Sequence, residues 1–128
     1  MVFVETSLFI IDNTGGYNCL CIGILSNSKK GRPGDVVLIS VKSILVNKKV
    51  LIRRKKKVLK GTVRKCVLLR VGYVLKRWGN IKIKFNSSGV AVIGRWDLPV
   101  GSRIYGPICF EARVNKYVRI AMLAEGSF

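Results

Sequence analysis

The stretch from Val36 to Trp96 contains seventeen Lys or Arg residues and no Asp or Glu. Val, Ile and Leu recur among these charges at the spacing of strands, so the cations belong to folded sequence and not to a disordered tail. A folded surface of one charge sign repels itself unless a polyanion neutralises it, and nucleic acid is the densest biological polyanion. The stretch therefore predicts a β-rich fold that binds a polyanion.

Composition agrees with a single folded domain over residues 1–128. A hydrophobic fraction of 49% favours a packed core despite a net charge of +18. The apolar runs, such as 36–39 and 90–93, are much shorter than the ~20 residues of a membrane-spanning helix. The N-terminus resembles neither a secretory signal nor an Arg- and Ser-rich transit peptide, so we expect no targeting segment.

Catalysis has few candidate groups in this chain. There is no His, so a Cys nucleophile would lack its usual base and the commonest proton shuttle is absent. The four cysteines, Cys19, Cys21, Cys66 and Cys109, lack the spacing and the His partners of a zinc site. We predict no catalytic residue, no metal and no cofactor, and interpret the cysteines as small buried residues.

Alternating and β-branched segments predict a mainly β fold. Strands are expected at 7–11, 18–25, 36–44, 62–74, 81–85 and 90–93. Asp12 and Asp35 precede or follow turn residues, and their carboxylates are expected to accept hydrogen bonds from nearby backbone N–H groups. We predict a small β-barrel over about 1–93 and a C-terminal loop and helix region over about 94–128, with one or two helical turns in 111–117 and a closing apolar segment at 118–124.

The basic residues of the predicted loops and strand faces are the candidate RNA contacts. They are Lys29, Lys30, Arg32, Lys42, Lys48, Lys49, Arg53, Arg54, Lys55, Lys56, Lys57, Arg64, Arg70, Lys76, Arg77, Lys82 and Lys84. A merely solvated surface would normally mix both charge signs, which disfavours that alternative.

The aromatic residues divide into two groups. Trp78 and Trp96 stand in the loop contexts Lys-Arg-Trp-Gly and Gly-Arg-Trp-Asp, where a ring can stack on an unpaired base. Packing over a loop or against a partner protein is the open alternative for both. Phe9, Phe85 and Tyr105 fall in apolar patterns and are predicted to be core residues.

Several segments, in order along the whole chain, resemble the universal large-subunit ribosomal protein fourteen family. The resembling segments are 6–15, 21–25, 34–37, Arg70, 84–85, the stretch Gly-Ser-Arg-Ile-Tyr-Gly-Pro-Ile at 101–108, 111–113, 116–117 and 123–124. The stretch at 101–108 is the most specific of them.

The resemblance implies a five-stranded OB-like β-barrel and a non-enzymatic structural constituent of the large ribosomal subunit. It implies large-subunit rRNA, ribosomal protein nineteen and small-subunit rRNA at an intersubunit bridge as partners, and a ribosome-silencing factor as a further one. The expected protein and bridge surface comprises Trp96, Arg103, Tyr105, Arg113 and Lys116. No membrane and no small-molecule substrate is expected.

Departures from the family pattern, such as Gly16, Gly23 and Ser88, indicate a fast-evolving organelle-encoded protein of a mitochondrial matrix ribosome. A plastid or a bacterial cytoplasm is the alternative location. The alternative function is a free-standing OB-type protein that binds single-stranded nucleic acid. A cationic membrane-active domain is disfavoured, because the charges lie among β-patterned segments and not on an amphipathic helix.

Overall fold

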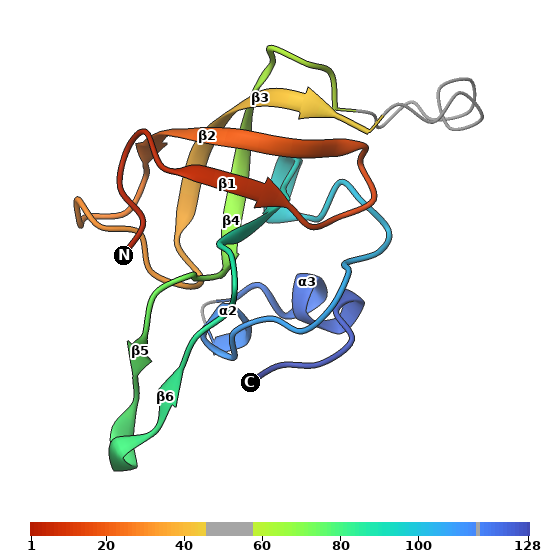
Figure 1. Ribbon diagram of the computed structural model, residues 1–128. Coiled ribbons are helices and arrows are strands. Elements are labelled where there is room, and N and C mark those ends of the chain that lie inside the picture. The colour runs from red at the N-terminus through yellow and green to blue at the C-terminus, as the bar shows by residue number, and fades with distance from the viewer. Residues whose placement is uncertain (46–57, 115) are drawn as a thin grey trace.

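Five strands close into a barrel in the computed structural model, which describes residues 1–45, 58–114 and 116–128. The barrel order is β1 (Ser7–Ile10), β2 (Gly16–Ile24), β3 (Val36–Ile44), β4 (Val63–Arg70) and β7 (Gly89–Val92) (Figure 1). Neighbouring strands are antiparallel except β1 and β7, whose parallel pairing closes the barrel. The predicted mainly β, five-stranded barrel is confirmed.

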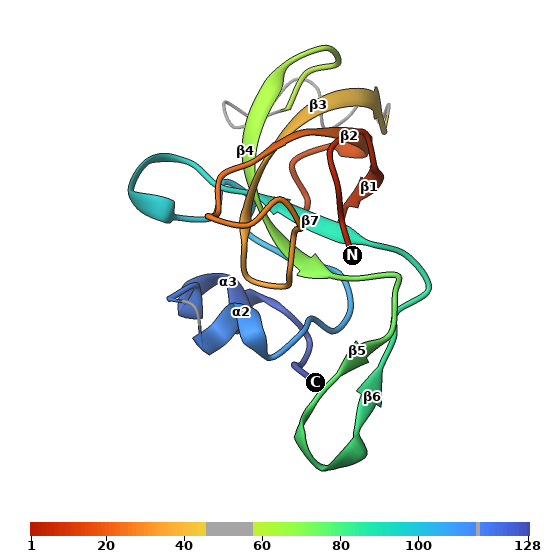
Figure 2. The same ribbon diagram turned by 90° about the vertical axis from the view of Figure 1, so that its left-hand side faces the viewer.

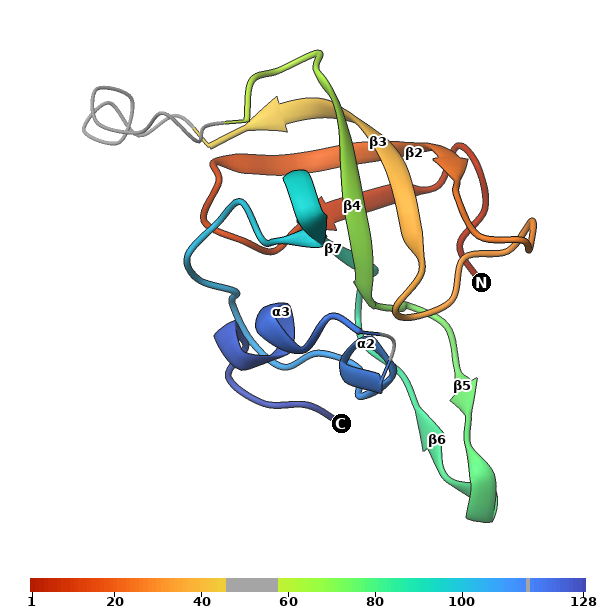
Figure 3. The same ribbon diagram turned by 180° about the vertical axis from the view of Figure 1, so that it is seen from behind.

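The remaining elements lie outside the barrel. Strands β5 (Leu75–Lys76) and β6 (Lys82–Ile83) form a separate two-stranded hairpin, with the 3₁₀ turn η1 (Trp78–Asn80) between them. A second 3₁₀ turn, η2 (Arg95–Asp97), precedes the helices α2 (Glu111–Val114) and α3 (Val118–Leu123). Figures 2 and 3 show the hairpin extending away from the barrel and both helices packed under one side of it.

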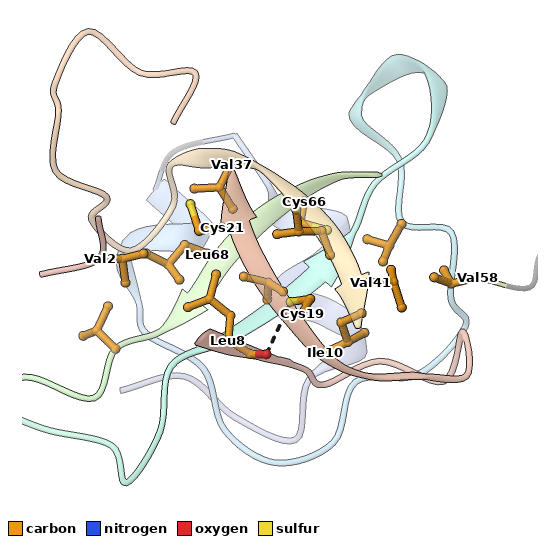
Figure 4. Close-up of a cluster of buried hydrophobic side chains, with 14 of the residues drawn as sticks. Val2, Leu8, Ile10, Cys19, Cys21, Val37, Val41, Val58, Cys66 and Leu68 are labelled. Atoms are coloured by element: carbon orange, nitrogen blue, oxygen red, sulfur yellow. Dashed lines mark hydrogen bonds between the residues drawn. The ribbon is translucent and has the colours of Figure 1, made fainter. Parts of the chain in front are cut away.

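The barrel interior is filled by alternate residues of its strands, because successive side chains of a strand point to opposite faces. Leu8, Cys19, Val37, Val41 and Leu68 are among the fully buried members of this cluster (Figure 4). The Cys19 thiol donates to the Leu8 carbonyl at 3.3 Å, which satisfies the thiol within the apolar core. Among the described residues, the barrel interior is therefore a packed hydrophobic core.

A second cluster joins the outside of the barrel to the helices. Val67 and Leu69 of β4 point outward and pack with Ala112, Tyr117 and Ile120 of the C-terminal region. Both faces of β4 are thus covered, which explains why its four consecutive residues 66–69 are all buried. The helices are fixed to the barrel by this outer cluster.

Two strand predictions need correction. The predicted strand at 62–74 ends at Arg70, since Gly72 follows within a bend that redirects the chain into the hairpin. The predicted strand at 81–85 contributes only Lys82–Ile83, and it pairs with β5 instead of joining the barrel. A two-residue alternation predicts a strand but not the sheet to which it belongs.

The buried and turn residues behave as the sequence predicts in most cases. All four cysteines are free and buried. The Asp35 carboxylate accepts from the Arg32 backbone N–H at 2.8 Å. Tyr105, predicted to be core, is instead half exposed: its backbone N–H donates to the Ile11 carbonyl just after β1, while its ring lies beneath the Arg103 guanidinium. Among the described helices, none has the length and apolar character needed to cross a membrane.

Candidate nucleic-acid interface and protein-contact surface

The structure divides the predicted RNA contacts between two regions. The first, the loop–hairpin region, comprises Lys29, Lys30 and Arg32 of the β2–β3 loop and Lys76, Lys82 and Lys84 of the hairpin segment, all exposed. The Tyr73 hydroxyl at the base of the hairpin donates to the Gly31 carbonyl of the loop at 3.4 Å. This contact places the base of the hairpin next to the loop, so the six cations lie on neighbouring segments.

The second region is the β3–β4 end, which comprises Lys42, Lys60 and Arg64, also exposed. The Val41 N–H donates to the Thr62 carbonyl at 3.0 Å, so the end of β3 lies beside the start of β4. Lys60 was not among the predicted contacts, although it lies in the same basic stretch of the sequence and could have been included on that ground. Lys48, Lys49, Arg53, Arg54, Lys55, Lys56 and Lys57 lie outside the described residues.

No carboxylate among the described residues pairs with any cation of these two regions. Three ion pairs are present in the described part of the chain, and they involve Lys65, Arg77 and Lys116. The charge of both regions is therefore left for an external anion to neutralise.

Arg70 has a structural environment that differs from those of the other predicted contacts. Its Nε donates to the Pro107 carbonyl at 2.7 Å, and its Nη2 donates to the Tyr105 carbonyl. Burial lowers the pKa of this half-buried guanidinium. Between the two carbonyls, Gly106 adopts φ +78°. Arg70 thus clamps the loop 105–107 to the end of β4.

Arg77 is likewise held within the molecule. Its Nε and Nη2 donate to the two Glu111 carboxylate oxygens at 2.7 and 2.6 Å, and Nη2 also donates to the Phe128 carbonyl at 2.5 Å. This bidentate pair ties the hairpin to α2 and to the last residue. The sequence pattern does not distinguish Arg70 and Arg77 from the exposed cations. The groups that accept their hydrogen bonds lie more than thirty residues away along the chain.

Trp96 and Lys116, both predicted for the protein and bridge surface, are brought together beside Asp97. The Asp97 carboxylate pairs with Lys116 at 3.6 Å and with Lys65 at 3.8 Å. Trp96 and Asp97 both have positive φ, at 60° and 56°, and the Trp96 side chain is 90% exposed. A shallow groove runs from Trp96 to Tyr117 and Ile120. Left-handed backbone at two successive non-glycine residues is uncommon and concentrates at functional sites.

The loop at 101–108 is positioned by the turn after β1. Asn13 Oδ1 accepts from the backbone N–H groups of Ser102 and Arg103 at 2.8 and 3.3 Å, and Asn13 Nδ2 donates to the Ser102 hydroxyl at 2.8 Å. This arrangement presents Arg103 over the Tyr105 ring, 5.4 Å from its centroid. The turn at Asn13 and the loop at 101–108 are both recognisable in the sequence. That the Asn13 side chain holds this loop is visible only in the structure.

Arg113, the remaining residue predicted for this surface, lies exposed on α2. The Asp12 carboxylate accepts from the nearby Thr14 N–H at 3.1 Å, as the sequence predicts, and also from the distant Val92 N–H at 2.8 Å, which the sequence does not reveal. In the described part of the chain, no group of three or more His, Cys, Asp or Glu side chains is arranged to hold a metal ion.

A closed five-stranded barrel with unpaired surface cations is the architecture expected of a nucleic-acid-binding barrel protein. The family model described as ribosomal protein L14p/L23e matches residues 1–128, and the chain belongs to this family. It is 38% identical to "Large ribosomal subunit protein uL14m" of Acanthamoeba castellanii over 128 residues, with 98% of each chain covered. The protein of the same name from Acanthamoeba polyphaga is 37% identical over 117 residues, which cover 90% of this chain and 99% of that protein.

Proposed function

We propose that this chain is a structural constituent of the large subunit of the mitochondrial ribosome and that its exposed cations bind large-subunit rRNA. The observation that carries the proposal is the pair of exposed cationic regions on a packed barrel, which have no carboxylate partner among the described residues and match a phosphate backbone. Family membership supports the ribosomal role, and the relatives' names support the large subunit and, through the suffix m, the mitochondrion. The role is structural and not enzymatic.

The rRNA contacts are assigned to the loop–hairpin region and the β3–β4 end, together with the predicted cations of 48–57. Arg70 and Arg77 are assigned a supporting role, since their guanidinium groups already bind carbonyl or carboxylate oxygens within the protein. Phosphate contacts of this kind fix position and affinity without reading the base sequence, as a structural ribosomal protein requires.

The protein and bridge surface is assigned to the Trp96–Lys116 groove, the Arg103–Tyr105 pair and Arg113. Its support is the resemblance at 101–108 and the exposure of these side chains. Ribosomal protein nineteen, small-subunit rRNA at an intersubunit bridge and a ribosome-silencing factor are the proposed partners. The strained backbone at Trp96 and Asp97 supports a contact role for the groove.

The test is sedimentation of the tagged chain in mitochondrial extract through a salt series. The wild-type chain is expected to travel with the large subunit and to resist moderate salt. Reversing Lys29, Lys30 and Arg32 to Glu should reduce the incorporated fraction, because these side chains are exposed and the barrel does not depend on them. The matched control exchanges Lys and Arg at the same three positions and keeps the charge.

Recovery of the wild-type chain as a free monomer would contradict the ribosomal role and favour the free-standing single-strand binder. Equal incorporation of the charge-reversed variant and its control would remove the β2–β3 loop from the rRNA contacts. In a binding titration with purified rRNA, the logarithm of the binding constant falls linearly with the logarithm of the salt concentration. Loss of three phosphate contacts should make this negative slope shallower by about 2–3.

A further inference from the structure

The β5–β6 hairpin has two chemically different faces. Leu75 lies opposite Ile83 in the register, and both are half-buried. Lys76 lies opposite Lys82, and both are exposed. Since strand side chains alternate between faces, Lys84 follows Lys82 on the same face. One face is therefore apolar and turned toward the protein, while the other carries three lysines.

The lysine face is unfavourable for the isolated protein. Like charges directly opposite each other on paired strands repel, and a two-stranded hairpin is only marginally stable in water. No Asp or Glu occurs in the whole sequence between Asp35 and Asp97, so the hairpin contains no acidic residue to separate Lys76 from Lys82. An anionic chain that lies along this face relieves the repulsion.

The tip of the hairpin presents an aromatic ring to solvent. Trp78 is 91% exposed, and among the described residues it has no ring contact or hydrogen bond. Gly79 and Asn80 follow it with φ values of +78° and +59°, and the Arg77 N–H donates to the Ile81 carbonyl at 2.8 Å to close the turn. The sharp turn thus leaves the indole almost fully exposed at the end of the hairpin.

The hairpin is held in a fixed direction. The bidentate pair between Arg77 and Glu111 joins it to α2, and Leu75 and Phe85 pack against the barrel core. All three views show the hairpin extending away from the barrel (Figures 1 to 3). A fixed direction lowers the entropy lost when the tip binds a partner.

We infer that the hairpin tip is a nucleobase-stacking site, in which the Trp78 indole stacks on an unpaired base of RNA while Lys76, Lys82 and Lys84 hold the adjoining phosphates. Aromatic rings flanked by cations are the usual platform for unpaired bases. A protein partner would need acidic groups along the lysine face, whereas RNA supplies the ring and the charge together. The inference rests on the proposed rRNA-binding function and assigns a further contact to it.

The first test is a titration of the full-length chain with a single-stranded oligoadenylate and with an abasic ribose-phosphate oligomer of equal length. Trp78→Ala should weaken oligoadenylate binding about 5- to 150-fold, the range of one lost base stack, and leave abasic binding unchanged. Trp78→Phe should keep most of the affinity. Met122→Ala is the control, because its side chain is also exposed, at 77%, but lies on α3 outside the cationic regions and the protein and bridge surface.

Fluorescence gives an independent reading. In a Trp96→Phe background, Trp78 is the only tryptophan of the chain, and oligoadenylate should quench it whereas the abasic oligomer should not. Equal loss of affinity for both oligomers, or no loss with Trp78→Ala, would overturn the inference. Because the side chain is almost fully exposed, circular dichroism of the variant is expected to match that of the wild type.

The second test separates this inference from the proposed function. Mitochondrial large subunits that contain Trp78→Ala should show one newly reactive rRNA base on dimethyl sulfate probing, compared with subunits that contain Met122→Ala. Subunits that incorporate the variant without any change in reactivity would overturn the stacking site alone. Absence of the wild-type chain from the subunits would overturn the proposed function as well.

Discussion

Gly106→Ala tests whether the Arg70 clamp stabilises the C-terminal loop. A methyl group on Gly106 would lie 2.5 Å from Arg70 Nη2, too close for the guanidinium to keep its place. Gly79 offers a matched control, since its φ is also +78° but no described atom lies within 4 Å of the point that an added Cβ would occupy. Comparing alanine at the two sites separates the contact from the backbone strain.

The magnitudes follow from the two environments. Alanine in the left-handed region costs about 1–2 kcal/mol at either site, and the lower entropy of the unfolded chain affects both equally. At Gly106 the displaced guanidinium also loses hydrogen bonds to the Pro107 or Tyr105 carbonyl, which adds about 1.5–3 kcal/mol. We therefore expect about 1–2 kcal/mol for Gly79→Ala and about 2.5–5 kcal/mol for Gly106→Ala.

Urea unfolding of the isolated chain, followed by far-ultraviolet circular dichroism, measures both values. In an Arg70→Met background, Gly106→Ala should cost no more than Gly79→Ala, because the obstructing group is gone. Equal costs for the two alanine variants in the wild-type background would refute the clamp.

Three further outcomes are expected. Burial raises the pKa of Asp12 above the ordinary 3.8, although its hydrogen bonds oppose the shift. The free energy of unfolding should therefore fall as the pH rises from 3.8 through the raised pKa. Urea midpoints measured across this pH range should show the fall in the wild type and not in Asp12→Asn. Arg77→Met should lower the free energy of unfolding by about 1–2 kcal/mol in the same assay, with Glu111→Gln closer to wild type. Burial raises the pKa of Cys19 to about 12 and that of Cys109 to about 11. A disulfide reagent at pH 8 should therefore label neither thiol until urea unfolds the chain. Rapid labelling of the native protein would contradict the burial of these thiols.

The barrel strands were predictable because each has one or two apolar faces of regular period. β3 was predicted with its observed bounds, Val36–Ile44, and β1, β2 and β7 to within about two residues. The hairpin was not, since its short alternation is the same whether the strand lies in the barrel or outside it. Pairing depends on contacts between distant segments, which local periodicity does not contain.

The candidate surface shows the same division. Exposure of Trp78 and Trp96 agrees with their loop contexts in the sequence. The inward use of Arg70 and Arg77 was not predictable, because an arginine that binds a distant carbonyl or carboxylate has the same sequence context as one that binds phosphate. Only the fold shows which guanidinium groups already have partners.

A density map of the native mitochondrial large subunit tests the central claim most directly. It should show this barrel with the loop–hairpin region and the β3–β4 end against rRNA phosphates. Lys29, Lys42 and Lys82 should then lie within contact distance of the RNA backbone. A map in which the barrel is present but both cationic regions face solvent would contradict the account.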